Sequence, residues 1–330
     1  MRSFLALFII MFVHHIAFAQ LDADTLKDKK QEANLAYTSL YKENSEMSYT
    51  SPFGELGAPS NYIINGKLTT TYLLFGPRNL PIAFAINPDF TARVRTDRSA
   101  GVRTPSFRLG GTFYARLAPD IKHYKYAELG FTHHSNGQDG DAMLPDGNIN
   151  TLTGNFNANF LTLAYAFGSF TDKKSSTGIY YSYNHKVGLQ WYKWFDYEPA
   201  LNGDFGFTRL KYDFSFRIYE LYTGKKGGWK KASGFNSTDK NTLEKETWRF
   251  NGQLSYAVNK MDFYQFFEPN RRLNIEVSAN YSLPFMQNVF LMASFGYYGE
   301  DPYNIYFKDK YAFARFGISS TFSKYKLSRN

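Results

Sequence analysis

The stretch "NANFLTLAYAFG", residues 157–168, carries the pattern that decides the fold. Its side chains alternate as in a β-strand, where successive residues point to opposite faces of the sheet. One face is large and apolar and consists of Leu161, Leu163, Tyr165 and Phe167. The other is smaller and slightly more polar and consists of Ala158, Phe160, Thr162, Ala164 and Ala166. Such a strand suits contact with lipid, but a soluble β-sandwich also alternates, so further features must choose between them.

Similar alternating runs of about ten to eighteen residues follow one another from residue 61 onward. Turn-rich tracts such as "TDKKSSTG" (171–178) separate most of them, and the runs number about eleven or twelve, with an even count expected in a bacterial barrel. After the N-terminal segment no window approaches the roughly 18 apolar residues of a membrane-spanning helix. Aromatic residues make up 19% of the chain, including 26 Tyr and 32 Phe, although the mean hydropathy is −0.43. The sequence therefore predicts an all-β transmembrane antiparallel β-barrel of about 12 strands.

The N-terminal segment "MRSFLALFIIMFVHHIAFAQ" (1–20) has the layout of a cleavable secretory signal, with residues 1–19 removed. We expect residues 20–59 to form a polar N-terminal periplasmic arm and residues 60–330 to form one barrel domain in the bacterial outer membrane. The absence of cysteine excludes disulfide and thiolate chemistry. The formal net charge of +9 fits a solvated basic rim, and an exported chain is not expected to bind nucleic acid.

The candidate chemistry lies in "KYAELGFTHHS" (125–135), because the expected mature chain has few histidines. Alternation places His133 and Ser135 on the apolar, lipid-facing side and His134 on the other. A serine hydroxyl becomes a nucleophile when a histidine takes its proton, and a third group must fix the tautomer of that histidine. The next strand offers asparagines of outward parity, and alternation does not choose among Asn155, Asn157 and Asn159.

The motif "THHSNG" (132–137), preceded by "AELGF", resembles the H-x-S-N-G signature of the outer-membrane phospholipase A family, the detergent-resistant type. The segments "RTPSFR" (103–108) and "FGYYGEDPYNIYFKDKYAFARFGI" (295–318) also resemble parts of that family. The resemblance implies a twelve-stranded barrel with an active site on its outer surface. It further implies hydrolysis of the acyl esters of membrane glycerophospholipids, a need for Ca²⁺, and activity as a homodimer.

Residue by residue, the resemblance implies that His133 is the general base and Ser135 the nucleophile, with Asn157 the best match for the orienting asparagine. It also implies an oxyanion donor in the Gly137 amide and a calcium ligand in the Gln138 carbonyl. The remaining candidate calcium ligands are Asp139 and Asp141 and, for the ligand from the partner subunit, Thr104 and Ser106. The loop before Asn157 is longer than the usual one of the family. The predicted function is a carboxylic ester hydrolase, a calcium-dependent phospholipase A of the outer membrane.

A second interpretation is a non-catalytic outer-membrane barrel, either a structural protein or a small channel, in which the motif is a relic. A lumen crowded by Tyr, Arg and Lys side chains would conduct poorly, which makes the channel the weaker form. Head-group preference, the acyl position that is cut and the activation trigger do not follow from the sequence.

Overall fold

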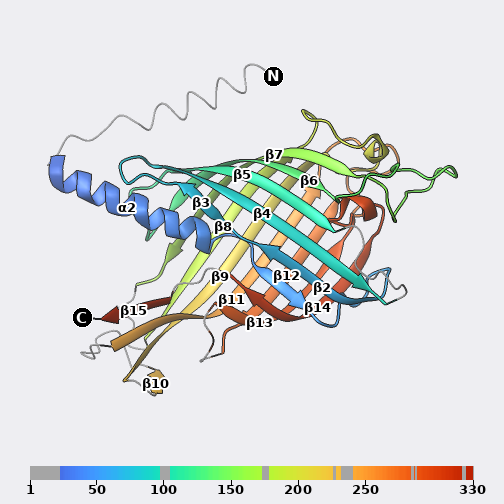
Figure 1. Cartoon of the computed structure of the whole chain (residues 1–330). Coiled ribbons are helices and arrows are strands. Elements are labelled where there is room, and N and C mark those ends of the chain that lie inside the picture. The colour runs from blue at the N-terminus through green and yellow to red at the C-terminus, as the bar shows by residue number, and fades with distance from the viewer. Residues whose placement is uncertain are drawn as a thin grey trace.

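The computed structural model describes residues 23–96, 105–172, 178–225, 228–231, 241–283, 286, 288–321 and 325–329. The expected signal segment, residues 1–19, lies outside these ranges. Within them the chain forms a closed antiparallel β-barrel of twelve strands, with one α-helix, α2 (Ala23–Glu43), at one mouth (Figure 1). The predicted fold class is confirmed. None of the helices in the described part is long and apolar enough to cross a membrane.

Each strand of the wall pairs antiparallel with its neighbours, and β1 pairs with β14 while β9 pairs with β11, which closes the barrel. The wall strands are β1 (Ser48–Ser51), β2 (Tyr62–Thr69), β4 (Ile82–Arg95), β5 (Ser106–Arg116), β6 (Lys125–Ser135), β7 (Asn157–Phe170), β8 (Ile179–Trp191), β9 (Thr208–Lys225), β11 (Asn241–Ala257), β12 (Leu273–Tyr281), β13 (Val289–Tyr298) and β14 (Tyr311–Ser320). Short additional strands are β3 (Tyr72–Phe75), β10 (Gly228–Lys231) and β15 (Tyr325–Arg329). Two 3₁₀ turns, η1 (Pro199–Leu201) and η2 (Asn304–Tyr306), lie in loops.

The wall shows the predicted alternation. On β7, Leu163, Tyr165 and Phe167 are exposed on the outer surface, whereas Ala164 and Ala166 are buried on the inner one. The outer residues of other strands are likewise large and apolar. An exposed apolar surface around a closed barrel is what lipid requires, because a closed sheet leaves no unpaired backbone edge in the hydrocarbon region.

The two mouths of the barrel differ. Longer loops, which include residues 136–156, 192–207, 258–272 and 299–310, gather at the mouth opposite α2. Three of them, residues 136–156, 192–207 and 299–310, pack around a shared apolar cluster that contains Phe156, Leu201, Phe205, Ile305 and Phe307. Shorter turns connect several strands at the α2 mouth. Since bacterial barrels carry their longer loops on the external side, the loop-bearing mouth is the external one.

Helix α2 is part of the barrel and does not hang from it as a separate arm. Its buried residues Tyr37, Leu40 and Tyr41 pack against inward side chains of the wall, and the ring of Tyr41 stacks on that of Tyr114 at 4.4 Å. Strand β1 then enters the wall, so the barrel begins at Ser48 and not near residue 60 as expected. The helix that the sequence assigned to an arm thus packs into one mouth of the barrel.

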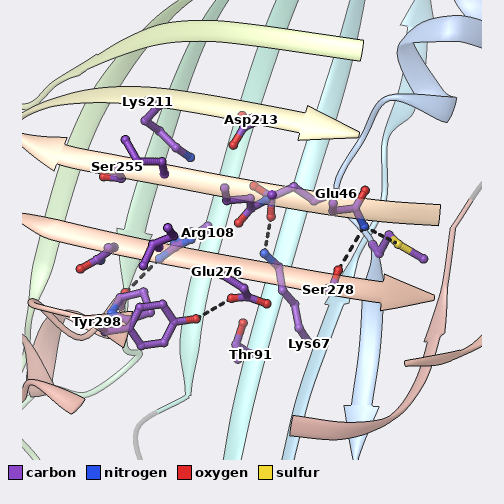
Figure 2. A pocket seen from close by; sticks show the side chains of 18 of the residues that line it. Glu46, Lys67, Thr91, Arg108, Lys211, Asp213, Ser255, Glu276, Ser278 and Tyr298 are labelled. Atoms are coloured by element: carbon purple, nitrogen blue, oxygen red, sulfur yellow. Dashed lines mark hydrogen bonds and ion pairs between the residues drawn. The ribbon is translucent and has the colours of Figure 1, made fainter. Parts of the chain in front are cut away.

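The lumen between the two mouths is lined with paired charges around a cavity of about 260 Å³ (Figure 2). Lys67 pairs with Glu46, from the segment after α2, and with Asp89 at 2.9 Å. Arg93 pairs with Asp301 at 2.6 Å. Buried charges of opposite sign offset the cost of removing each other from water, so these pairs tie β2 to β4 and to the segment after α2, and β4 to the 299–310 loop.

Candidate active site

Strands β5, β6 and β7 place two rows of side chains at the external end of the outer wall. In the first row His133 lies between Leu109 of β5 and Asn159 of β7, and in the second Ser135 lies between Phe107 and Asn157. His133 is exposed and Ser135 is half-buried. The structure therefore places the two residues on the outward side, as the alternation predicts.

The ring of His133 is held by a chain of hydrogen bonds. His133 Nδ1 lies 2.8 Å from Asn159 Oδ1, and Asn159 Nδ2 donates to the backbone carbonyl of Asp196 at 3.0 Å. Because the Asp196 carbonyl can only accept, it fixes the amide with its oxygen toward the ring. Nδ1 must then carry the proton, which leaves the lone pair on Nε2. This is the tautomer that a general base needs.

His133 therefore makes its hydrogen bond to Asn159. The expectation that Asn157 is the asparagine that orients His133 is corrected to Asn159. Asn157 lies opposite Ser135, one row nearer the loop, and its backbone carbonyl accepts from the Glu198 N–H at 3.0 Å. Asn155 lies before β7, and its backbone N–H donates to Gly140 at 2.8 Å. Parity allowed all three asparagines, and only the register of β6 with β7 separates them.

The Asp196 carbonyl comes from the 192–207 loop, which packs over the end of β7. The ring of Phe195 meets that of Phe131 edge to face at 5.1 Å, and Tyr197 packs on Phe207 at 4.4 Å. A backbone bridge between Tyr197 and Ala158 ties the loop to β7. This contact could not be predicted from the sequence, because a backbone carbonyl has no side-chain signature.

Ser135 and Gly137 leave polar groups open on this surface. Within the described part of the chain, neither the Ser135 hydroxyl nor the Gly137 N–H makes a hydrogen bond. Gly137 is exposed and has φ of +64°, the left-handed region that glycine adopts without a steric penalty. A free amide two residues after a free hydroxyl suits the oxyanion role implied for Gly137.

Asn136, the asparagine of the motif, stabilises the loop after Ser135, a structural role that the sequence analysis did not predict. Its buried side chain donates to Gly154 O at 2.7 Å and accepts from the Phe156 N–H at 3.0 Å. These bonds join the two ends of the 136–156 loop directly beside Ser135. The loop can therefore be long without loosening the end of β6.

The opposite face of the same strands carries a different pair. His134 is only 3% exposed and its Nε2 lies 2.7 Å from Ser106 Oγ inside the barrel, so the predicted inward position of His134 is confirmed. The expectation that Ser106 is a calcium ligand from the partner subunit is therefore wrong, because Ser106 lies in the lumen, behind the wall that carries Ser135. Thr104, the other candidate for the partner-subunit ligand, lies outside the described residues.

The remaining calcium candidates lie in the external loop after Ser135. Gln138 is half-buried, and Asp139 and Asp141 are exposed. Asp146 is engaged locally, since two hydrogen bonds from Asn148 hold the pKa of its carboxyl below the usual value. The described residues contain no cluster of three or more His, Asp or Glu suited to a metal ion. Calcium takes about six to eight oxygen ligands, so this donor set does not by itself fit the ion.

The closed barrel with its apolar outer wall defines a multi-pass β-barrel protein of the outer membrane. No protein-family model and no curated protein matches the sequence. Among solved structures, outer membrane phospholipase A from Escherichia coli is similar at 12% identity and a TM-score of 0.47, with 84% of this chain and 90% of that chain covered. The β domain of the Bordetella autotransporter BrkA is 13% identical with a TM-score of 0.33, covering 84% and 97%. BamA from Haemophilus ducreyi lacking POTRA domains 1–3 is 11% identical with a TM-score of 0.27, covering 84% and 70%. At such low identity we infer chemistry from this chain's own side chains.

Proposed function

We propose that the protein is an outer-membrane hydrolase of the phospholipase A type, which cleaves acyl esters of glycerophospholipids at its outer surface. Ser135 is the nucleophile, His133 the general base and Asn159 the residue that orients the base. The observation that carries the proposal is the hydrogen-bonded chain from His133 through Asn159 to the Asp196 carbonyl, on the lipid-facing wall beside an unpaired serine.

The reaction follows from the positions of these groups. Residues two apart on a strand are separated by about 6.5 to 7 Å at Cα, so side-chain rotation brings Ser135 Oγ toward His133 Nε2. Nε2 takes the hydroxyl proton as Oγ attacks the ester carbonyl, and the Gly137 N–H stabilises the tetrahedral oxyanion. His133 then protonates the departing glycerol oxygen, which releases a lysophospholipid. Water, activated by His133, hydrolyses the acyl-serine and releases the fatty acid.

The position of the site on the outer wall supports the proposed substrate class. Phe107, Leu109 and Phe131 are exposed apolar side chains around His133 and Ser135, on the wall that faces the hydrocarbon region. An acyl chain lying along this wall presents its ester near the external end of β6, where the head groups begin. Soluble esters would gain no comparable apolar contact, so a membrane lipid is the proposed substrate.

Calcium and a second subunit are proposed as conditions for activity. One chain supplies few calcium ligands, and a homodimer facing the same lipid surface would bring further oxygens to Gln138, Asp139 and Asp141. When bound beside the site, the cation would add positive charge near the developing oxyanion. The measurement is the cross-linked dimer fraction and the hydrolysis rate with calcium and with chelator; no effect of calcium on either would contradict both conditions.

The decisive experiment measures fatty-acid release by the refolded barrel from phospholipid in mixed micelles. We expect release by the wild type and none above background by Ser135→Ala. Ser106→Ala serves as the matched control, because it removes a serine hydroxyl from the other face of the barrel. Equal release by wild type and Ser135→Ala, with calcium and detergent varied, would refute the hydrolase proposal. The channel interpretation has no comparable support, since α2 packs into one mouth and the external loops cluster at the other.

A further inference from the structure

The 258–272 loop, between β11 and β12, displays phenylalanines at its surface. Phe263 is 81% exposed, Phe266 49% and Phe267 90%. For comparison, Val277 on the lipid-facing wall is 49% exposed, so Phe263 and Phe267 are considerably more exposed than this wall residue. Single exposed apolar residues are ordinary, but three phenylalanines within five positions form a patch that water solvates poorly. Such a patch points to a partner that covers it.

A buried arginine fixes the backbone of this loop. Arg272 is 2% exposed, and its guanidinium donates to four carbonyls of the loop and its flank. Nε donates to Gln265 at 2.7 Å, Nη2 to Tyr264 at 2.8 Å, and Nη1 to Ala257 and Asn259, each at 2.9 Å. Charge-assisted bonds of this kind are strong and specify one backbone path. The hydrogen bonds of Arg272 therefore hold the backbone that carries the exposed phenylalanines in one conformation.

The neighbouring Arg271 adds a second constraint. It is one of two described non-glycine residues with positive φ, at +63°, a conformation that carries a steric cost. Its side chain donates to the backbone carbonyl of Phe307, in the external apolar cluster, and to the hydroxyl of Tyr264. Arg271 therefore ties Tyr264, beside the exposed phenylalanines, to the external apolar cluster at Phe307.

The position of the loop relative to the membrane follows from β11. Tyr256 lies on the outward face of β11, meets Phe266 edge to face at 6.0 Å and donates its hydroxyl hydrogen to the Phe266 carbonyl. Trp248 lies on the same face, eight residues earlier. That separation is about 26 Å of strand, or roughly 20 Å of height at the tilt usual in barrels, close to the height of the apolar band. Tyr256 therefore marks the external boundary of the hydrocarbon region.

We propose that the 258–272 loop is a lipid-binding foot, whose Phe263, Phe266 and Phe267 insert at the boundary between head groups and acyl chains in the external leaflet. The occupant is lipid because the patch continues the lipid-facing wall without a break, from Leu254 through Tyr256 to Phe266. The foot lies several strands away from β6 and β7 around the barrel. It therefore acts independently of the proposed hydrolysis and fixes the depth of the barrel on the β11–β12 side.

The chain has no cysteine, so a single introduced cysteine can carry one nitroxide label. The full-length protein, refolded into phosphatidylcholine vesicles, is labelled in turn at Phe267→Cys, at Val277→Cys on the wall and at Asp146→Cys on an exposed polar loop. Electron paramagnetic resonance then compares relaxation by oxygen, which concentrates in the acyl region, with relaxation by a polar nickel complex. We expect an oxygen-to-nickel ratio at position 267 several-fold above that at 146 and approaching that at 277.

Two results would overturn the proposal. A ratio at 267 equal to that at 146 would place the foot in water, and dipolar broadening from labels on two barrels would make the occupant a second copy of the chain. Phe263→Cys provides a second labelling site if Phe267→Cys fails to refold, as judged by heat-modifiable mobility on gels. Neither reading depends on catalytic activity.

Discussion

Two adjacent histidines on β6 show how the face of a strand decides what a residue can do. His133 faces lipid, its ring is held by Asn159, and the hydroxyl two residues away is unpaired within the described part of the chain. His134 faces the lumen, where its ring is already bonded to the Ser106 hydroxyl at 2.7 Å. Both have a serine near them, but only the outer pair has an open hydroxyl and access to an ester. The face of the barrel wall on which a histidine and a serine lie, more than the residue types themselves, decides whether the pair is available for catalysis.

The inner pair belongs to the framework that supports the outer one. Arg108, on the inner face of β5, donates to the Pro302 carbonyl at 2.9 Å, and Asn304 donates to the His134 carbonyl at 3.4 Å. These bonds connect β5 and β6 to the 299–310 loop at the external mouth. The lumen side therefore fixes the height at which β6 ends, and the lipid side carries the open groups.

The largest expected difference between the two faces is in the two serines. Ser135→Ala should lower fatty-acid release by at least about 1,000-fold, because without the nucleophile only binding and the oxyanion donor remain. Ser106→Ala should keep release within a few-fold of wild type. The measurement is the initial rate in mixed micelles with calcium present. A comparable loss in both variants would show that the two faces do not differ in the way proposed.

Substitution of the two histidines should have different effects. Loss of His133 should lower the rate, and loss of His134 should lower the stability. His133→Ala should approach the loss of Ser135→Ala, because the base is required for both acylation and deacylation. His134→Ala should leave the rate of the folded fraction nearly unchanged and lower stability by roughly 1 to 3 kcal/mol, since the buried Ser106 hydroxyl loses its partner. Rates normalised to the folded fraction, together with urea unfolding in detergent, test both. An unchanged rate in His133→Ala would remove it as the base.

The asparagines of β7 sharpen the comparison within the outer face. Asn159→Ala should cost roughly one to two orders of magnitude less than His133→Ala, as third members of other triads do, because orientation assists the base without replacing it. Asn157→Ala should have little effect on the rate, since Asn157 lies opposite Ser135 and does not contact the ring. The comparison uses kcat from substrate titrations of both variants. A larger loss in Asn157→Ala would restore the assignment made from the motif.

These residues also show how far the sequence could predict the molecule. Period-two alternation is a local property, so strand positions, the outward parity of Ser135 and the inward position of His134 could all be predicted. The partner of His133 depends on the register between β6 and β7, which the intervening loop sets through Asn136. The entry of α2 into the lumen depends on packing between residues far apart in sequence, and polarity alone suggested an arm. The Asp196 carbonyl was beyond prediction, because it is a backbone group delivered by a loop.

The smallest predicted effect concerns that carbonyl. Phe195→Ala removes the ring that rests on Phe131 and should loosen the Asp196 carbonyl, so the Asn159 amide is held less firmly. We expect kcat to fall by a few-fold with little change in KM. Nitrogen NMR of histidine-labelled protein should show the single Nδ1-protonated form of His133 giving way to a mixture of tautomers. The NMR signal reports orientation directly, whether or not a substrate is turned over.

Trp194→Ala is the control that separates positioning from lipid contact. Trp194 is the adjacent exposed aromatic residue, and its ring contacts Trp191 at 5.9 Å, away from the bond to Asn159. If the 192–207 loop acts through Asp196, Trp194→Ala leaves the tautomer and kcat unchanged while Phe195→Ala alters both. If the loop only touches substrate, both variants raise KM and neither changes the tautomer. That second pattern would leave His133 oriented by Asn159 alone and would reduce the 192–207 loop to a surface for lipid.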